Sequence, residues 1–172
     1  MPQPPELGKV TWTEADFEQM GWHDARVVAF AVRPETYEVE FDLDYIVEWV
    51  DPSERGGNYS FWSAPATLVF ENVRKLVLHM EPDPPEFEII GIERDEPSHE
   101  LPLGTTPWGS TIRGPEWRWQ FDLGRGTLSF RSTGYQQYFR RPPLFVGQQQ
   151  QPTLAQRGGI SFARAWNSKG TV

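Results

Sequence analysis

Cysteine is absent from this chain of 172 residues, and its absence excludes disulfides, thiolate metal sites and cysteine nucleophiles. Histidine is scarce, since only His23, His79 and His99 occur, far apart in the sequence. A zinc site without cysteine needs two or three histidines, usually with a carboxylate, so we predict no metal and no cofactor. The phosphate-binding Gly-Lys-Ser/Thr loop, the Gly-x-Ser-x-Gly elbow and the His-Glu-x-x-His motif are also missing. We therefore predict no catalytic residues and expect a protein that is not an enzyme.

Long apolar runs are missing too. The longest span only a few residues, as at 27–32, whereas a membrane helix needs about 20. The first residues, Met-Pro-Gln-Pro-Pro-Glu, contain neither the basic segment nor the apolar run of a signal peptide. The formal net charge of −8 repels nucleic acid and anionic membranes and favours a basic partner. We expect a soluble, cytoplasmic protein that contacts no membrane and no nucleic acid.

Aromatic and turn-forming residues, in contrast, are plentiful. Eight Trp and eleven Phe favour pleated, half-buried surfaces, and sixteen Pro with fifteen Gly indicate many turns. One short helix is predicted where Thr13 and Asp16 can form a capping box and Gly21 ends the run. After it the apolar period changes to two, which is typical of strands. The predicted strands cover residues 23–33, 36–50, 59–71, 73–80, 87–94, 116–123, 127–132 and 136–140, with a last short strand at 160–162.

These elements predict an all-β protein, a single antiparallel sandwich or barrel-like domain of about eight strands with one short N-terminal helix. We expect residues 1–9 to form an extended arm, residues 95–115 a long connection, and residues 142–172 an irregular C-terminal segment. Pro65 has no backbone N–H to donate, so it is expected to mark an edge or a bulge of its strand.

The strand predicted at 36–50 carries a stripe of acids. Apolar residues at 39, 41, 43 and 45 alternate with acids, so the acids share one face of the strand. This acidic stripe consists of Glu38, Glu40, Asp42 and Asp44, with Glu48 beyond them. Such a face is either a wet sheet surface, a carboxylate site for Ca²⁺ or Mg²⁺, an acid–base pair, or a surface for a basic partner. We predict the last, with these five residues as the partner-binding site.

The charges are distributed unevenly along the chain. The first 112 residues hold 7 basic and 22 acidic side chains, and the last 60 hold 9 and 2. Late strands of an antiparallel fold can lie beside early ones, so Arg118 and Arg131 are candidates to face the acidic stripe. Aromatics interleaved with arginines can also stack on bases, but the net charge disfavours nucleic acid. Internal pairing and a basic partner thus remain the two explanations of the stripe.

Trp22, His23 and Asp24 directly follow the predicted helix, where the chain turns into its first long strand. The polar tips of Trp and His usually find backbone partners when buried, so we predict that these residues anchor the corner. The alternative is a small-ligand carrier with a Trp-lined pocket, whose candidate lining is Trp22, His23, Trp117 and Trp119.

The segment from the short helix through Gly21-Trp22-His23-Asp24-Ala25 to the strand with Phe41-Asp-Leu-Asp44 resembles small bacterial β-rich proteins of the immunity type. The resemblance covers roughly residues 1–50. Such proteins neutralise toxins encoded beside them by covering the toxin's active site, and they have no catalytic residues. The resemblance implies a small cytoplasmic binding protein, which here would present the acidic stripe to a basic protein partner. The ligand carrier is the alternative function, and a metal-dependent enzyme at the stripe is a third.

Overall fold

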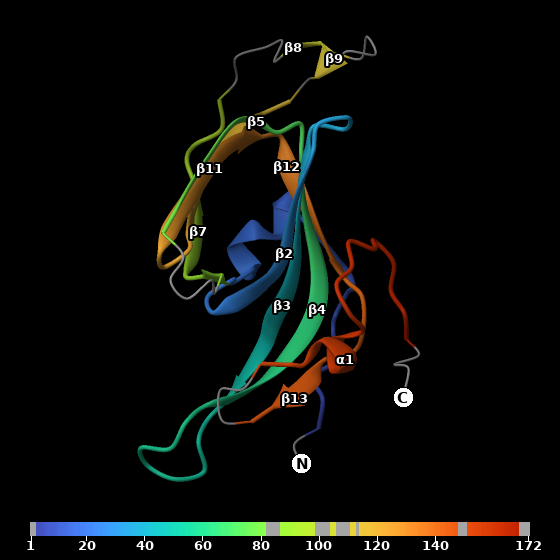
Figure 1. Cartoon of the computed structure of the whole chain (residues 1–172). Helices are drawn as coiled ribbons and strands as arrows, with labels where there is room; N and C mark the ends of the chain where they lie inside the picture. The colour runs from blue at the N-terminus through green and yellow to red at the C-terminus, as the bar shows by residue number, and fades with distance from the viewer. Residues whose placement is uncertain are drawn as a thin grey trace.

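Antiparallel strands dominate the computed structural model, which describes residues 3–81, 87–98, 104–105, 111–112, 114–147 and 151–168 (Figure 1). The all-β prediction is confirmed. The described residues form thirteen strands, more than the predicted number of about eight, because several pairings involve only two or three residues. The strands are β1 (Thr11–Thr13), β2 (Ala25–Arg33), β3 (Glu38–Val50), β4 (Ser60–Glu71), β5 (Arg74–Met80), β6 (Glu88–Ile89), β7 (Gly91–Arg94), β8 (Gly104–Thr105), β9 (Thr111–Ile112), β10 (Trp117–Asp122), β11 (Gly126–Ser132), β12 (Gly134–Phe139) and β13 (Leu144–Val146).

The larger sheet has seven strands in the order β1-β12-β4-β3-β2-β6, and β13 pairs with the free part of β4. Its centre is the hairpin of β3 and β4, the two longest strands, with 13 and 12 residues. The apolar residues of β3, such as Phe41 and Leu43, enter the core, and the acids lie on the other face, as the period of two predicted. Both faces of β3 are buried over most of its length, so its acids need partners inside the protein.

The smaller sheet, in the order β5-β11-β10-β7, curls over one face of the larger sheet (Figure 1). The residues of β10 alternate strictly between buried and exposed, which defines an inner and an outer face. Trp119, Phe121 and Phe130 pack on Phe70 of the larger sheet, with ring centroids 4.9, 5.6 and 4.8 Å apart. Aromatic pairs at these distances add to the stability gained by burial. This aromatic layer between the sheets is the core.

The predicted N-terminal helix is present as a 3-10 helix, η1 (Glu14–Gln19). The Thr13 backbone N–H donates to the Asp16 carboxylate at 2.8 Å, as the capping box predicted. The run is short because the chain turns at Trp22 into β2.

The C-terminal segment is more ordered than predicted. It contains β13 and a second short helix, α1 (Leu154–Arg157), which Thr153 caps and which ends at Gly158 with φ 82°. The prediction of a strand at 160–162 is wrong, because this part of the chain runs across the larger sheet without joining it as a strand. Neither helix of the described residues has the length and apolar character needed to cross a bilayer.

Pro65 lies within β4, a central strand, which corrects the expectation of an edge or a bulge. On one side its neighbour is Asp44 of β3. On the other side β12 ends opposite Ala66 and β13 begins opposite Ser63, so the missing N–H of Pro65 falls between two partner strands. The Pro65 carbonyl still accepts the Arg140 backbone N–H at 2.9 Å. The sheet tolerates a proline at this position because the partner strand of β4 changes there from β12 to β13, so no hydrogen bond from residue 65 is needed.

Candidate functional site

The acidic stripe is buried under the C-terminal segment. Asp42, Asp44 and Glu40 are 0%, 1% and 5% exposed. Arg157 of α1 inserts between the two aspartates: its Nε donates to Asp44 at 2.8 Å and its Nη1 to Asp42 at 2.9 Å. The backbone N–H of Ser161 also donates to Asp42, at 2.8 Å. The C-terminal segment therefore supplies cations and hydrogen-bond donors that the stripe would otherwise lack.

Other arginines complete the neutralisation of the stripe. The remaining ion pairs are Arg26–Asp44, Arg33–Glu40, Arg140–Asp42, Arg164–Glu38 and Arg164–Glu40. The structure thus shows internal pairing, but Arg118 and Arg131 do not provide it, since they lie on the smaller sheet. The acids of the stripe pair instead with arginines of β2 and of the irregular segment that follows β12.

For Arg157 and Glu38, pairing outweighs the effect of burial on the pKa. Burial lowers the pKa of Arg157, but the hydrogen bonds and charges of Asp42 and Asp44 outweigh burial, and the net pKa is raised. Burial raises the pKa of Glu38, but the hydrogen bonds from Arg164 and Thr36 hold it below its ordinary value. A buried charge that loses its partner costs several kcal/mol, so each member of this network depends on the others.

Four of the five predicted partner-binding residues therefore already form ion pairs within the chain. Glu40, Asp42 and Asp44 are buried, Glu38 is half-buried, and all four pair with arginines of the same chain, so they do not form the open surface that was expected. Glu48 differs, because its side chain is exposed and has no hydrogen bond or ion pair within the described chain.

The tryptophans predicted to line a ligand pocket lie in the core. Trp22, Trp117 and Trp119 are 4%, 8% and 0% exposed, and the Trp22 indole N–H donates to Gln137 at 2.8 Å. An apolar crevice between the sheets has a volume of about 20 Å³, and no tryptophan lines it. Ligand pockets usually measure about 300–1,000 Å³. The three predicted lining tryptophans therefore pack into the core and do not line this crevice.

The corner between η1 and β2 buries Trp22 and leaves its neighbours at the surface. Asp24 has φ 60° and turns the chain, and its N–H donates to the Ile89 carbonyl at 2.9 Å. The His23 side chain is 68% exposed, with Nδ1 3.0 Å from the Asp24 carboxylate. Trp22 is thus buried at the corner, but its indole N–H binds the Gln137 side chain and not the predicted backbone partner, and the exposed His23 pairs with the Asp24 side chain.

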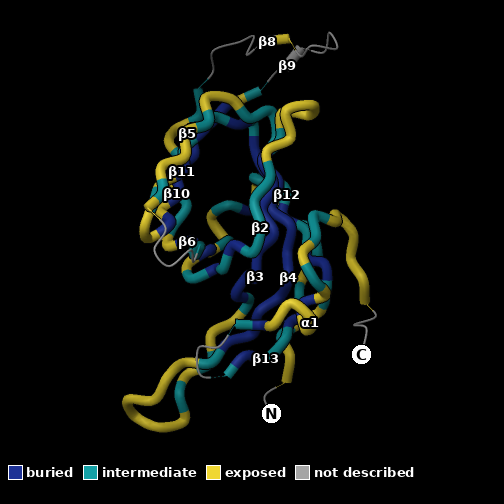
Figure 2. The backbone as a smooth tube through the Cα atoms, in the orientation of Figure 1, coloured by how far each residue is buried: buried dark blue, intermediate teal, exposed yellow. Residues whose placement is uncertain are grey.

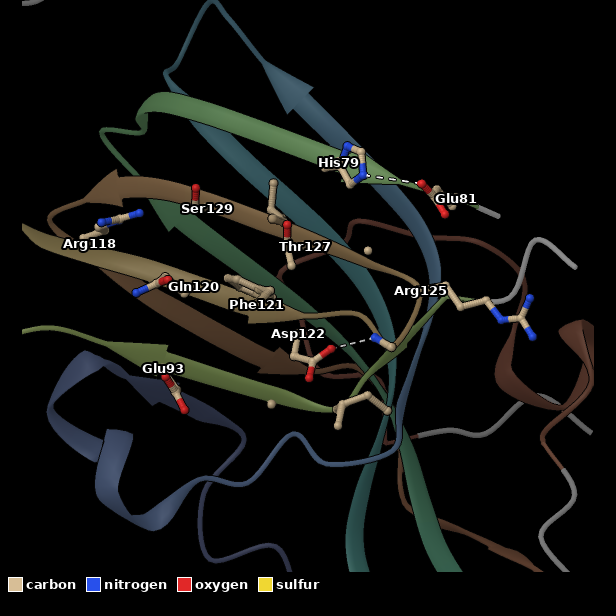
Figure 3. Close-up of a pocket in the computed structure, with 15 residues that line it drawn as sticks. His79, Glu81, Glu93, Arg118, Gln120, Phe121, Asp122, Arg125, Thr127 and Ser129 are labelled. Carbon is tan, nitrogen blue, oxygen red and sulfur yellow. Dashed lines mark hydrogen bonds and ion pairs between the residues drawn. The ribbon is translucent and has the colours of Figure 1, made fainter. Parts of the chain in front are cut away.

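A large open groove lies instead on the outer face of the smaller sheet (Figure 3). Its volume is about 1070 Å³, and it crosses all four strands and the turn between β10 and β11. Its polar lining consists of His79, Glu81, Glu93, Arg118, Gln120, Asp122, Arg125, Thr127 and Ser129. These side chains project from the face of the sheet opposite the aromatic core. The packed core on the other face holds the strands, and with them these side chains, in place.

Strand register arranges the floor of the groove in two rows across the sheet. The rows are Glu93–Gln120–Ser129–Val77 and Gly91–Asp122–Thr127–His79. Neighbouring strands lie about 4.8 Å apart, and successive rows about 6.5–7 Å apart. The groove therefore presents donors and acceptors at regular spacings in two directions.

Several groove side chains have no partner within the part of the chain that the structure describes. The hydrogen-bonding side chains without a bond or ion pair there are Glu93, Arg118, Gln120, Thr127 and Ser129. Asp122, in contrast, accepts the Gly124 N–H at 2.8 Å (Figure 3). Among the described residues no group of three or more histidines and carboxylates could hold a metal ion. The arrangement is suited to recognition through hydrogen bonds.

Sequence reasoning did not find the groove. The alternation at 116–123 correctly predicts that Arg118, Gln120 and Asp122 face away from the core. A period of two does not say which strands are neighbours, so the contribution of Glu93 from β7 was not visible. The curl of the sheet, which hollows this face, depends on packing between segments far apart in the sequence.

A comparison of the chain with protein-family models, curated proteins and solved structures finds no match. The immunity-type resemblance is therefore untested by these comparisons and stays a prediction.

Proposed function

We propose that this chain is a non-catalytic binding protein that holds an extended segment of a partner protein in the groove of the smaller sheet. The observation that supports this is the set of unpaired side chains on the groove floor. Gln120 and Ser129 are neighbours across β10 and β11, and their side chains have no hydrogen-bond partner in the described chain. The buried acids of β3, in contrast, are paired with arginines. A partner protein that supplies hydrogen-bond donors and acceptors would pair with these side chains.

The shape and chemistry of the groove favour a macromolecule over a small ligand. Small-ligand sites are mostly apolar and enclose their ligand, whereas this groove is open and most of its lining side chains are polar. An extended peptide repeats its backbone groups about every 6.5–7 Å along one side, which is the spacing between the two rows. Glu81, Glu93 and Asp122 in the lining disfavour a nucleic-acid phosphate backbone.

This proposal keeps the class of function that the immunity-type resemblance implies, namely binding to a partner protein. It moves the contact surface from the acidic stripe to the groove, because the stripe already has its arginines.

A pair of exposed substitutions tests the proposal. Arg118→Ala combined with Gln120→Ala removes two unpaired groups without touching the core. The control combines Glu35→Ala and Glu96→Ala, two exposed residues outside the groove. Tagged wild type and both variants are used to capture binding partners, which are quantified by mass spectrometry.

We expect a partner that wild type and control retain and that the groove variant loses at least tenfold, at unchanged unfolding midpoint. If wild type and groove variant retain the same partners equally, the groove is not the contact surface.

A further inference from the structure

The hairpin of β3 and β4 carries a second surface, far from the groove. Its connecting loop, residues 51–59, projects at the end of the molecule opposite the curled sheet (Figure 1). Nearly the whole loop is exposed (Figure 2). A projecting hairpin is accessible to a partner without any rearrangement of the fold.

Two aromatic side chains at the base of this loop are exposed. Trp49 and Tyr59 are 44% and 45% exposed and meet edge to face, with ring centroids 6.1 Å apart. The Trp49 ring also packs against Phe61, at 5.5 Å, and Phe61 belongs to a small buried cluster with Ile46 and Val146. The rings are thus held from one side and open to solvent on the other. Trp and Tyr are the residues most enriched where binding energy concentrates in protein interfaces.

The charge around this pair is negative and unpaired. The side chains of Glu48, Asp51 and Glu54 are exposed and have no hydrogen bond or ion pair within the described chain, and Arg55 is the one basic residue between 48 and 59. Asp51 follows Trp49 by two residues, which puts it about 6.5–7 Å further along the same side of an extended chain. A cation placed over the Trp49 ring therefore lies near a carboxylate.

We propose that this hairpin is a docking surface for a basic segment of a partner protein, with an arginine stacked on Trp49 and paired with Asp51. Arginine fits better than lysine, because its planar guanidinium stacks on an indole and can still donate to a carboxylate. Glu48 and Glu54 add an attractive field that speeds association with a basic partner. The surface is independent of the groove, since the two share no residue.

The test uses short synthetic peptides as probes. N-acetylated, C-amidated tetra-arginine and tetra-lysine are titrated separately into ¹⁵N-labelled full-length protein, and the indole and backbone amide signals are followed by NMR. The variants are Trp49→Ala and Asp51→Asn. Trp166→Ala, another exposed tryptophan at 36%, and Glu35→Gln, another exposed acid, serve as matched controls.

We expect tetra-arginine to shift the Trp49 indole signal and the amides of residues 48–59 in a saturable way. Trp49→Ala is expected to weaken binding about two- to fivefold, the value of a cation–π contact at an exposed site. Asp51→Asn weakens it as well, the two controls bind as wild type does, and tetra-lysine binds less tightly than tetra-arginine.

Three results overturn the proposal. They are shifts confined to other parts of the protein, equal affinity of the Trp49→Ala variant and wild type, and equal affinity of the two peptides. Urea unfolding of each variant checks that its fold is intact, which the exposure of the substituted residues leads us to expect.

Discussion

Asp42→Asn should be among the most destabilising single substitutions in this protein. Asp42 is fully buried and accepts hydrogen bonds from Arg140, Arg157 and the Ser161 N–H. An amide of the same size leaves Arg157 with Asp44 as its remaining carboxylate and removes the carboxylate that pairs with Arg140. Removal of one partner from a buried ion pair costs about 3–5 kcal/mol. In a chain of this length, that corresponds to a loss of roughly 6–20 °C in melting temperature.

Glu38→Gln is the matched control, on the same strand and the same face. Its partner Arg164 is 38% exposed, and pairs at such exposure contribute about 0–1 kcal/mol. Urea unfolding at neutral pH measures both variants, and an unchanged slope shows that the same surface unfolds. Combined with Arg157→Gln, Asp42→Asn should cost less than the sum of the two single changes. The reasoning is refuted if Asp42→Asn costs no more than Glu38→Gln.

Two further predictions concern the core and the response to acid. Trp22→Ala should cost about 3–5 kcal/mol in urea unfolding, whereas His23→Ala, at an exposed position, should stay within about 0.5 kcal/mol; equal effects would contradict the role of Trp22 at the corner. Burial raises the pKa of Glu116, but hydrogen bonds from Arg74 and Arg131 outweigh it and hold the pKa below its ordinary value of 4.5. The advantage of wild type over Glu116→Gln should therefore be complete above pH 4.5 and should disappear as the pH falls through the lower pKa of the folded state. An advantage that persists at still lower pH would refute this.

Strand positions followed from the sequence because β3 and β10 alternate cleanly between apolar and polar residues. Their inner faces were predicted correctly for the same reason. What covers the outer faces was not predicted, because alternation identifies the side chains that point away from the core but does not identify the segment that packs on them. Arg157 lies in a segment without periodicity, and only the folded chain brings it to Asp42.

The tryptophans illustrate a second limit. Trp117 and Trp119 point inward under either reading of the sequence, as part of a packed core or as the lining of a pocket. Which of the two applies depends on how closely the sheets approach, and Phe70 fills the space between them. The groove could not be predicted, because it arises from the neighbouring positions of β7, β10, β11 and β5 and from their common curl.

Site-specific photo-crosslinking tests the central claim, that the groove is the surface that binds a partner protein. A benzophenone amino acid is placed at Gln120 in the groove and, in a separate protein, at Ile160, which is 58% exposed on the segment that covers the acidic stripe. Each protein is irradiated with the partner that wild type captures, and the products are identified by mass spectrometry. We predict a crosslink from position 120 to an extended segment of the partner and none from position 160. A crosslink from position 160 alone would contradict the account, because it would place the partner on the face of the acidic stripe.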